Sequence, residues 1–221
     1  MMTYPMHVAG LVRDLPICKV TEDFYIGAFI MFGDAELTVA CARDLLKLAE
    51  ELDYDYLLTA EAKSIPLIHE MARQSGAEKY FIARKGPKVY MPDPISVEDR
   101  SITTLGVQQL FLGRDDADLI KGKKILIVDD VISTGGSLIE TVEALREAGA
   151  KVLGAVSIFT YGMEKGKQRL AEAKVRAVSL TDFDEIVAVA EAEGYIPAHT
   201  VPGLMAFRAN PSDESWMGGK K

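Results

Sequence analysis

Two hydrophobic patterns alternate along the chain after about residue 30. Short, mostly apolar runs predict β-strands, and segments with apolar residues three and four positions apart predict amphipathic helices. The runs of strand type cover residues 54–60, 79–83, 105–112, 124–129, 151–159 and 175–180. The segments of helical type cover residues 34–52, 64–74, 136–148, 164–174 and 182–193, and we expect the last of these to be the final helix.

Local signals mark where several of these helices begin and end. Asp34 is a favourable N-cap for the first helix. Pro66 lies in the first turn of the second helix, and Gly76 follows its end. Gly149 directly follows the helix that begins at Gly136. These signals support the boundaries that the hydrophobic pattern suggests.

Alternating strands and helices predict an α/β domain with a mostly parallel central sheet flanked by helices. We expect residues 1–33 to form a separate N-terminal segment and residues 34–195 to form the core. Residues 196–221 would form a C-terminal segment, whose polar and glycine-rich end we expect to be frayed. Residues 86–103 contain three prolines and little periodicity, so they predict a long loop, which in a compact domain is usually functional or disordered.

Composition narrows the class of protein. A chain of 221 residues suits one well-packed domain, and its net charge of −8 argues against general affinity for nucleic acid. No run approaches the ~18 apolar residues of a membrane helix, and the N-terminus lacks the pattern of a secretory signal. Cys18 and Cys41 fit neither a disulfide framework nor a zinc site. We therefore expect a cytoplasmic protein with two reduced, buried thiols.

The strongest chemical signal is the string Ile-Val-Asp-Asp-Val-Ile-Ser-Thr-Gly-Gly-Ser at residues 127–137. It follows an apolar run without alternation, which predicts a strand buried on both faces. Such a strand would deliver Asp129 and Asp130 to the carboxyl edge of the sheet, where ligands bind. Buried carboxylates need partners, and a sugar diol or a metal ion would supply them. Gly135 and Gly136 let the backbone approach an anion at a helix start.

A sugar diol beside a phosphate is a sugar phosphate, so these residues predict a sugar-phosphate site. The alternative is an ordinary strand-to-helix turn that one aspartate closes. The other glycine-containing segment with a lysine, residues 162–167, resembles a nucleotide P-loop only superficially. We interpret residues 162–167 as a solvated turn.

Residues 128–137 closely resemble the motif that binds 5-phosphoribosyl-1-pyrophosphate (PRPP) in type I phosphoribosyltransferases. The resemblance implies the fold of that family over roughly residues 34–180. It implies that Asp129 and Asp130 hold the ribose hydroxyls and that a loop cradles the 5-phosphate. The loop residues are Ile132, Ser133, Thr134, Gly135, Gly136 and Ser137. It also implies that Mg²⁺ rides on the substrate near the two aspartates, without a dedicated protein cage, and that the protein forms a homodimer.

A second segment lies between the first core strand and the helix that follows it. It resembles the pyrophosphate loop of the adenine and xanthine enzymes, and its residues are Glu61, Ala62, Lys63 and Ser64. A cation and free amides at a helix start suit a diphosphate. The alternative is an ordinary polar turn.

A third segment ends the next strand with Arg84, Lys85 and Lys88. It is similar to the segment that opens the family's mobile catalytic loop. Cations placed there would stabilise the charge that develops on a departing pyrophosphate, and a closing loop would exclude water. The alternative is a solvated basic turn.

The choice of base depends on positions outside these motifs. Enzymes for hypoxanthine and guanine usually carry an Asp where this chain has Ser133, so that branch is disfavoured. Adenine enzymes carry a base-assisting Glu, which is missing near residues 104–107, although Glu98 or Asp99 could substitute. The resemblance also implies that residues 1–33 form a small hood that places Phe24 and Ile26 over the base, whereas a phenylalanine at this position is more often plain core.

We therefore expect transfer of the phosphoribosyl group from PRPP to a purine base, with adenine favoured over xanthine. Pyrophosphate would leave C1 of the sugar as a ring nitrogen of the base attacks. The expected catalytic residues are Lys85, Glu98, Asp129 and Asp130. One alternative is a non-catalytic PRPP sensor, against which the short N-terminal segment and the negative charge argue. The other is a pyrimidine or orotate enzyme, which the Arg84–Lys85 pair favours and the Glu61–Lys63 loop fits less well.

Overall fold

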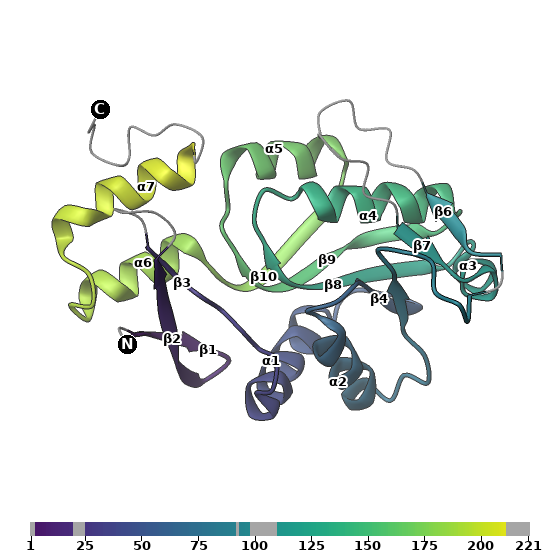
Figure 1. Ribbon diagram of the computed structural model, residues 1–221, viewed down its shortest axis with the longest axis horizontal. Coiled ribbons are helices and arrows are strands. Elements are labelled where there is room, and N and C mark those ends of the chain that lie inside the picture. Colours follow the sequence, from purple (N-terminus) through teal and green to yellow (C-terminus); the bar gives the residue numbers. More distant parts are fainter. Residues whose placement is uncertain (1–2, 20–24, 92, 98–109, 211–221) are drawn as a thin grey trace.

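A parallel sheet of five strands forms the centre of the computed structural model, which describes residues 3–19, 25–91, 93–97 and 110–210. The strand order is β10–β9–β8–β4–β5, and every neighbouring pair is parallel (Figure 1). The strands are β4 (Tyr56–Ala60), β5 (Phe81–Ala83), β8 (Lys124–Ile132), β9 (Lys151–Thr160) and β10 (Arg176–Asp182). The carboxyl ends of all five therefore meet at one edge.

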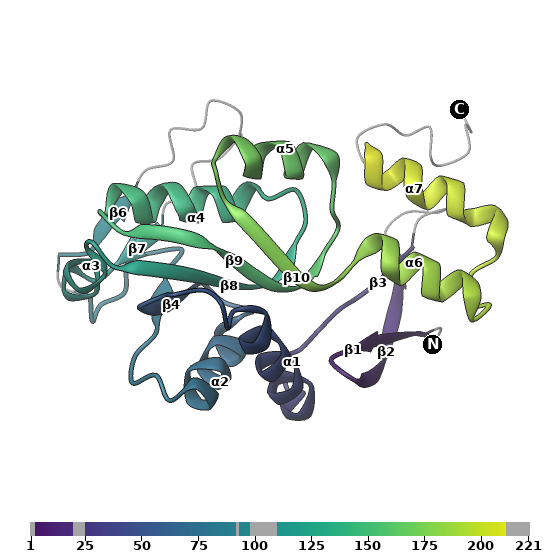
Figure 2. The same ribbon diagram turned by 180° about the vertical axis from the view of Figure 1, so that it is seen from behind.

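Helices cover both faces of this sheet. Helices α1 (Ala35–Leu48) and α2 (Ile65–Ser75) lie on one face, and α4 (Gly136–Glu147) and α5 (Glu164–Glu172) lie on the other, as Figure 1 and Figure 2 both show. The expected α/β fold with a parallel sheet flanked by helices is thus confirmed. Among the described residues, no helix is both long and apolar enough to cross a membrane.

The sequence signals at the helix ends act as expected. The Asp34 carboxylate accepts a hydrogen bond from the Leu37 amide at 2.9 Å and caps α1. Gly76 ends α2 in the left-handed conformation, with φ of 73°, which glycine adopts without steric cost. The apolar run in β8 is buried on both faces, and none of its residues Ile125–Val128 is more than 2% exposed.

A second, antiparallel sheet precedes the core, with the order β1–β2–β3. Its strands are β1 (Thr3–Val8), β2 (Leu11–Lys19) and β3 (Tyr25–Gly27). In both views this sheet lies together with α6 (Phe183–Ala192) and α7 (Val201–Ala209), beyond the end of the central sheet at which β10 leads into α6 (Figure 1 and Figure 2). A single 3₁₀ turn, Ala198–Thr200, joins α6 to α7.

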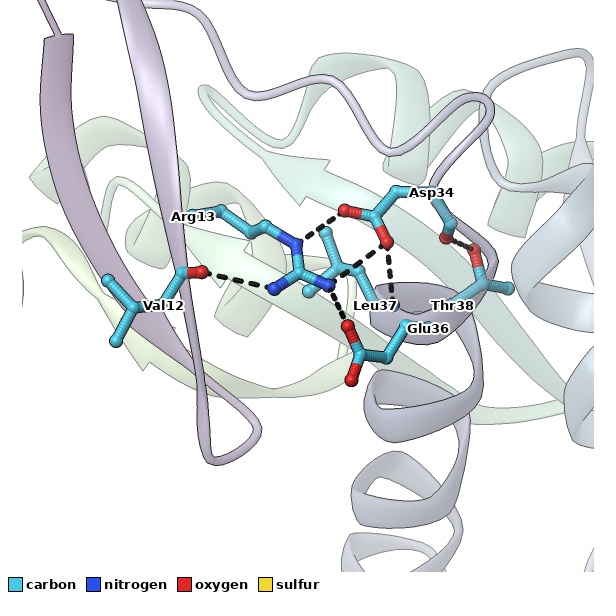
Figure 3. Close-up of polar contacts among 6 residues, drawn as sticks. All are labelled: Val12, Arg13, Asp34, Glu36, Leu37 and Thr38. Carbon is cyan, nitrogen blue, oxygen red and sulfur yellow. Dashed lines mark hydrogen bonds and ion pairs between the residues drawn. The ribbon is translucent and has the colours of Figure 1, made fainter.

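Two sets of polar contacts fasten the N-terminal sheet. Arg13 of β2 contacts the Asp34 carboxylate through Nε at 2.5 Å and Nη2 at 3.2 Å, and Nη2 also reaches Glu36 at 2.8 Å (Figure 3). The hydrogen bond from Arg13 holds the pKa of Asp34 below its usual value. On the other side, the Tyr4 hydroxyl donates to the Ile186 carbonyl at 3.2 Å. The sheet is thus bound both to the start of α1 and to α6.

Several expectations about secondary structure are wrong. Residues 86–103, expected to be a loop, contain β6 (Ile95–Val97), which pairs with β7 (Leu110–Leu112). Strands of three residues are too short to show a hydrophobic period. Helix α3 (Arg114–Ile120) was not indicated, and α6 is not the last helix because α7 follows. The expected frayed end, residues 211–221, lies outside the described residues.

Of the two thiols expected to be buried, one is buried and the other is exposed. Cys41 is fully buried in α1, and burial raises its pKa to about 12. Cys18 is exposed, because it lies in the small N-terminal sheet, where several β2 side chains face solvent.

The pairing of β9 with β10 depends on a glycine. Gly154 is buried opposite Arg176, and a Cβ atom there would lie 2.4 Å from the Arg176 carbonyl oxygen. We expect Gly154→Ala to lower the free energy of unfolding by about 2 kcal/mol, because the two strands must separate. Chemical denaturation measures this change. Gly86→Ala is the control, since a Cβ there meets nothing within 4 Å, and equal stability of the two variants would contradict the prediction.

Candidate active site

Two adjacent carboxylates lie near the carboxyl end of β8. Asp130 is 8% exposed, and Asp129 is partly buried beside it. The Ser64 hydroxyl lies 3.2 Å from Asp129 Oδ1 and 3.4 Å from Asp130 Oδ1, and the Asp130 amide donates to Asp129 Oδ1 at 2.9 Å. Burial, and next the charge of Asp130, raise the pKa of Asp129. A ligand that brings hydroxyl groups or a cation would relieve this repulsion.

The loop after the aspartates presents an anion site. Gly135 has a φ of 74°, and α4 begins directly after it without a side-chain cap. The first amides of a helix have no partner within the helix, so they are free to bind an anion. The side chains of Ser133, Thr134 and Ser137 are exposed around them, whereas that of Ile132 is buried. The loop is therefore open to solvent on the side of its hydroxyl groups.

Helix α5 supports this loop from behind. Gly166 is buried, and a Cβ atom there would lie 3.1 Å from the Thr134 carbonyl oxygen. Leu170 of the same helix lies 3.6 Å from the position of a Cβ at Gly135. The interpretation of residues 162–167 as a solvated turn is therefore wrong, because the absence of a side chain at Gly166 lets α5 pack against the loop.

The segment between β4 and α2 contacts both the aspartates and the cationic segment. Ser64, at its end, is 1% exposed and faces the two aspartates. Glu61, at its start, accepts from Arg84 Nη1 at 3.1 Å and from the Lys85 amide at 3.2 Å, and it lies 3.6 Å from Lys88 Nζ. The peptide bond that follows Glu61 is cis. The three segments singled out from the sequence thus meet at the carboxyl ends of β4, β5 and β8.

Two of the expected cations remain available. The side chains of Lys63 and Lys85 are exposed, as is Ala62, and neither lysine side chain forms a hydrogen bond or ion pair with another described residue. Ile26 lies in β3 of the N-terminal sheet. Phe24, Glu98 and Asp99, and the positions 104–107 where an acid was sought, fall outside the described residues.

An aromatic row that no sequence pattern indicated starts at the site. The Tyr161 amide donates to the Ile132 carbonyl at 2.9 Å, which ties the end of β9 to the loop. The Tyr161 ring stacks on Phe183 with centroids 5.9 Å apart, and Phe183 lies 6.5 Å from Phe207 of α7. A single tyrosine after a strand forms no motif, which is why this row was missed.

Magnesium was expected to arrive with the substrate. Within the described part of the chain, no group of three or more His, Cys, Asp or Glu side chains is placed to hold a metal. Asp129 and Asp130 are two oxygen donors with an unfavourable mutual charge, which fits a Mg²⁺ ion that keeps other ligands from its substrate.

Comparison with known proteins bears on the choice of base. The orotate phosphoribosyltransferase of Bacillus cytotoxicus is 53% identical over 97 residues, which are 44% of this chain and 46% of that protein. The same enzyme of Bacillus cereus is 50% identical over 97 residues. The aligned part of the chain spans about half the length of these curated relatives.

Solved structures share the fold at low sequence identity. The adenine phosphoribosyltransferase of Thermoanaerobacter pseudethanolicus has a TM-score of 0.62 and 19% identity, covering 76% of this chain and 95% of that one. The orotate phosphoribosyltransferase of Aeropyrum pernix has a TM-score of 0.57 and 21% identity, covering 81% and 91%.

The expectation of a purine base and of purine salvage is wrong, because the relatives that share about half of the aligned residues are orotate enzymes. The error has a physical origin. The aspartate pair and the glycine loop would contact the sugar and its phosphate, which are the same whichever base is used. Adenine was inferred from the resemblance of residues 61–64 to a pyrophosphate loop, and such a loop would contact the pyrophosphate and not the base.

The sequence profile of the phosphoribosyl transferase domain matches residues 39–193, well over half of the chain. This span contains all three segments that meet at the carboxyl edge of the sheet. The chain therefore belongs to the phosphoribosyl transferase family.

Proposed function

We propose that the protein transfers the 5-phosphoribosyl group of PRPP to orotate, with release of pyrophosphate. The observation that carries the choice of base is the identity of about half of the aligned residues with orotate phosphoribosyltransferases. The geometry supports PRPP as the donor, since buried paired carboxylates adjoin an open helix N-terminus.

The described residues have distinct roles in this proposal. Asp129 and Asp130 accept hydrogen bonds from the two ribose hydroxyls, and their negative charge faces a sugar that becomes cationic as the bond at C1 breaks. The amides and hydroxyls of residues 133–137 bind the 5-phosphate. Mg²⁺ bound to the substrate would neutralise the charge of the diphosphate and of the aspartates.

The leaving pyrophosphate is stabilised by four cationic side chains, those of Lys63, Arg84, Lys85 and Lys88. Arg84 is 24% exposed and Lys88 38%, so both remain near solvent at the edge of the sheet. The bond between C1 and the diphosphate oxygen breaks with its electron pair moving to the oxygen. A ring nitrogen of orotate forms the new bond to C1 as its N–H bond breaks, and the proton passes to the departing, Mg²⁺-bound pyrophosphate.

The first test is a panel of free bases incubated with PRPP and Mg²⁺. We expect orotate to be consumed with release of an equal amount of pyrophosphate, and we expect adenine, xanthine, hypoxanthine and guanine to release none. Chromatography of the nucleotide product and a pyrophosphate assay measure both. The double variant Asp129→Asn/Asp130→Asn is the inactive control. Turnover of adenine in place of orotate would contradict the proposal.

The second test separates binding from stability at the aspartate pair. The Asn side chain in Asp129→Asn still accepts hydrogen bonds from Ser64 and from the Asp130 amide, but it removes one charge. We expect PRPP affinity to fall about 100-fold, because a charge-assisted hydrogen bond from a ribose hydroxyl and the electrostatic attraction to substrate-bound Mg²⁺ are lost. Calorimetric titration with PRPP and Mg²⁺ measures this, and unchanged affinity would refute the ribose assignment.

The same variant should become the more stable protein as the pH rises. A raised pKa means that the folded protein binds a proton more tightly than the unfolded chain, so stability falls as pH increases above the ordinary aspartate value of about 4. Asp129→Asn removes this dependence. Thermal unfolding of the ligand-free proteins between pH 5 and pH 8 should therefore favour the variant increasingly, whereas parallel curves would contradict the assignment of a strained pair.

A further inference from the structure

One carboxylate organises most of the cationic segment. Glu61 Oε1 lies 3.1 Å from Arg84 Nη1 and 3.6 Å from Lys88 Nζ, while Oε2 accepts from the Lys85 amide at 3.2 Å. The three partners come from a stretch of five residues. A single side chain thus fixes the direction of two cations and of the backbone between them.

The backbone of Glu61 is fixed as well. Its amide donates to the Ala83 carbonyl at 2.9 Å, which extends the pairing of β4 with β5 by one residue beyond Ala60 and Ala83. Arg84 in turn forms two backbone hydrogen bonds with Phe111, at 2.9 and 2.8 Å. The backbones of Glu61 and Arg84 are therefore both held by hydrogen bonds, and the contacts between their side chains do not depend on a flexible turn.

Glu61 is unsuited to contact the substrate itself. Burial alone would raise its pKa, but the Lys85 amide and the charges of Lys88 and Arg84 outweigh burial, so its pKa lies below its usual value. An ionised carboxylate repels a diphosphate. Its two cationic partners outnumber it, however, and the cluster keeps a net positive charge. This charge lies at the other end of the short segment whose Ser64 faces the aspartates.

If the protein binds PRPP as proposed, we infer that Glu61 is a positioning residue that holds Arg84 and Lys88 at the pyrophosphate site before substrate binds. Both ion pairs are partly exposed, at 24% for Arg84 and 38% for Lys88. Pairs of this kind are weak, so a diphosphate with several charges competes for the cations successfully. Arg84 and Lys88 then move only a short distance from the Glu61 carboxylate to the diphosphate. Without Glu61 they would first have to be ordered from many solvent-exposed conformations.

A double-mutant cycle on PRPP affinity tests this inference, with Mg²⁺ present and no base. We expect Glu61→Ala to raise the Kd for PRPP about tenfold in the wild-type background, which corresponds to about 1.4 kcal/mol. In the background Arg84→Met/Lys88→Met we expect the same change to alter Kd less than about twofold, because the cations that Glu61 positions are gone. Glu61→Gln keeps the acceptor oxygen without the charge and should show an intermediate loss.

The matched control is Asp116→Ala on helix α3, which removes the surface ion pair of 2.8 Å between Asp116 and Lys79. It should leave the Kd for PRPP unchanged. Thermal unfolding of every variant establishes that the fold is retained. Equal effects of Glu61→Ala in both backgrounds would overturn the inference, since Glu61 would then act through general stability. Tighter binding by Glu61→Ala would also overturn it, because the carboxylate would be a competitor of the substrate.

The outcome is separable from that of the proposed function. PRPP binding is measured without any base, so failure of orotate turnover leaves the cycle interpretable. If the wild-type protein binds PRPP but the effects of the substitutions on Kd are additive, only the inference about Glu61 is overturned. A wild-type protein with no affinity for PRPP overturns both.

Discussion

The structure is organised around one electrostatic repulsion. It acts between two carboxylates held side by side near the end of a strand that is buried on both faces. Among the described side chains, Ser64 alone is placed to donate to Asp129 and Asp130, and its single hydroxyl proton serves only one of them at a time. Their repulsion is therefore only partly relieved, and burial, followed by the charge of Asp130, raises the pKa of Asp129. Such a local cost is typical of a binding site.

The parts around this pair are held in place from behind, which leaves their ligand-facing groups open. Gly166 lets α5 support the loop of residues 133–137 through backbone contact, so the exposed hydroxyls of Ser133 and Thr134 are not used for packing. Glu61 holds the cationic segment in the same manner from the neighbouring strand. Preorganisation of this kind lowers the cost of ordering side chains when a charged ligand binds.

The sequence was sufficient for the parallel core sheet and for the family because both depend on local patterns. The apolar run of β8, the cap at Asp34 and the glycine at Gly135 each act within a few residues of their own position. The elements that were missed are short or depend on distant partners. The strand at residues 95–97 exists because it pairs with residues 110–112, and α7 is fastened by Arg208, which donates to the Gly162 carbonyl at 3.2 Å.

The same distinction explains why the base was mistaken although the family was recognised. In the proposed reaction the base would approach the sugar over the aspartate pair. The N-terminal sheet, α6 and α7 lie beyond the end of the central sheet at which β10 leads into α6 (Figure 1). These parts are held in place by polar contacts between distant residues, such as Arg13 with Asp34 and Tyr4 with Ile186, and by buried apolar side chains such as Met6. A short sequence motif does not record contacts between residues so far apart. A motif that reads the sugar phosphate therefore carries no information about the base.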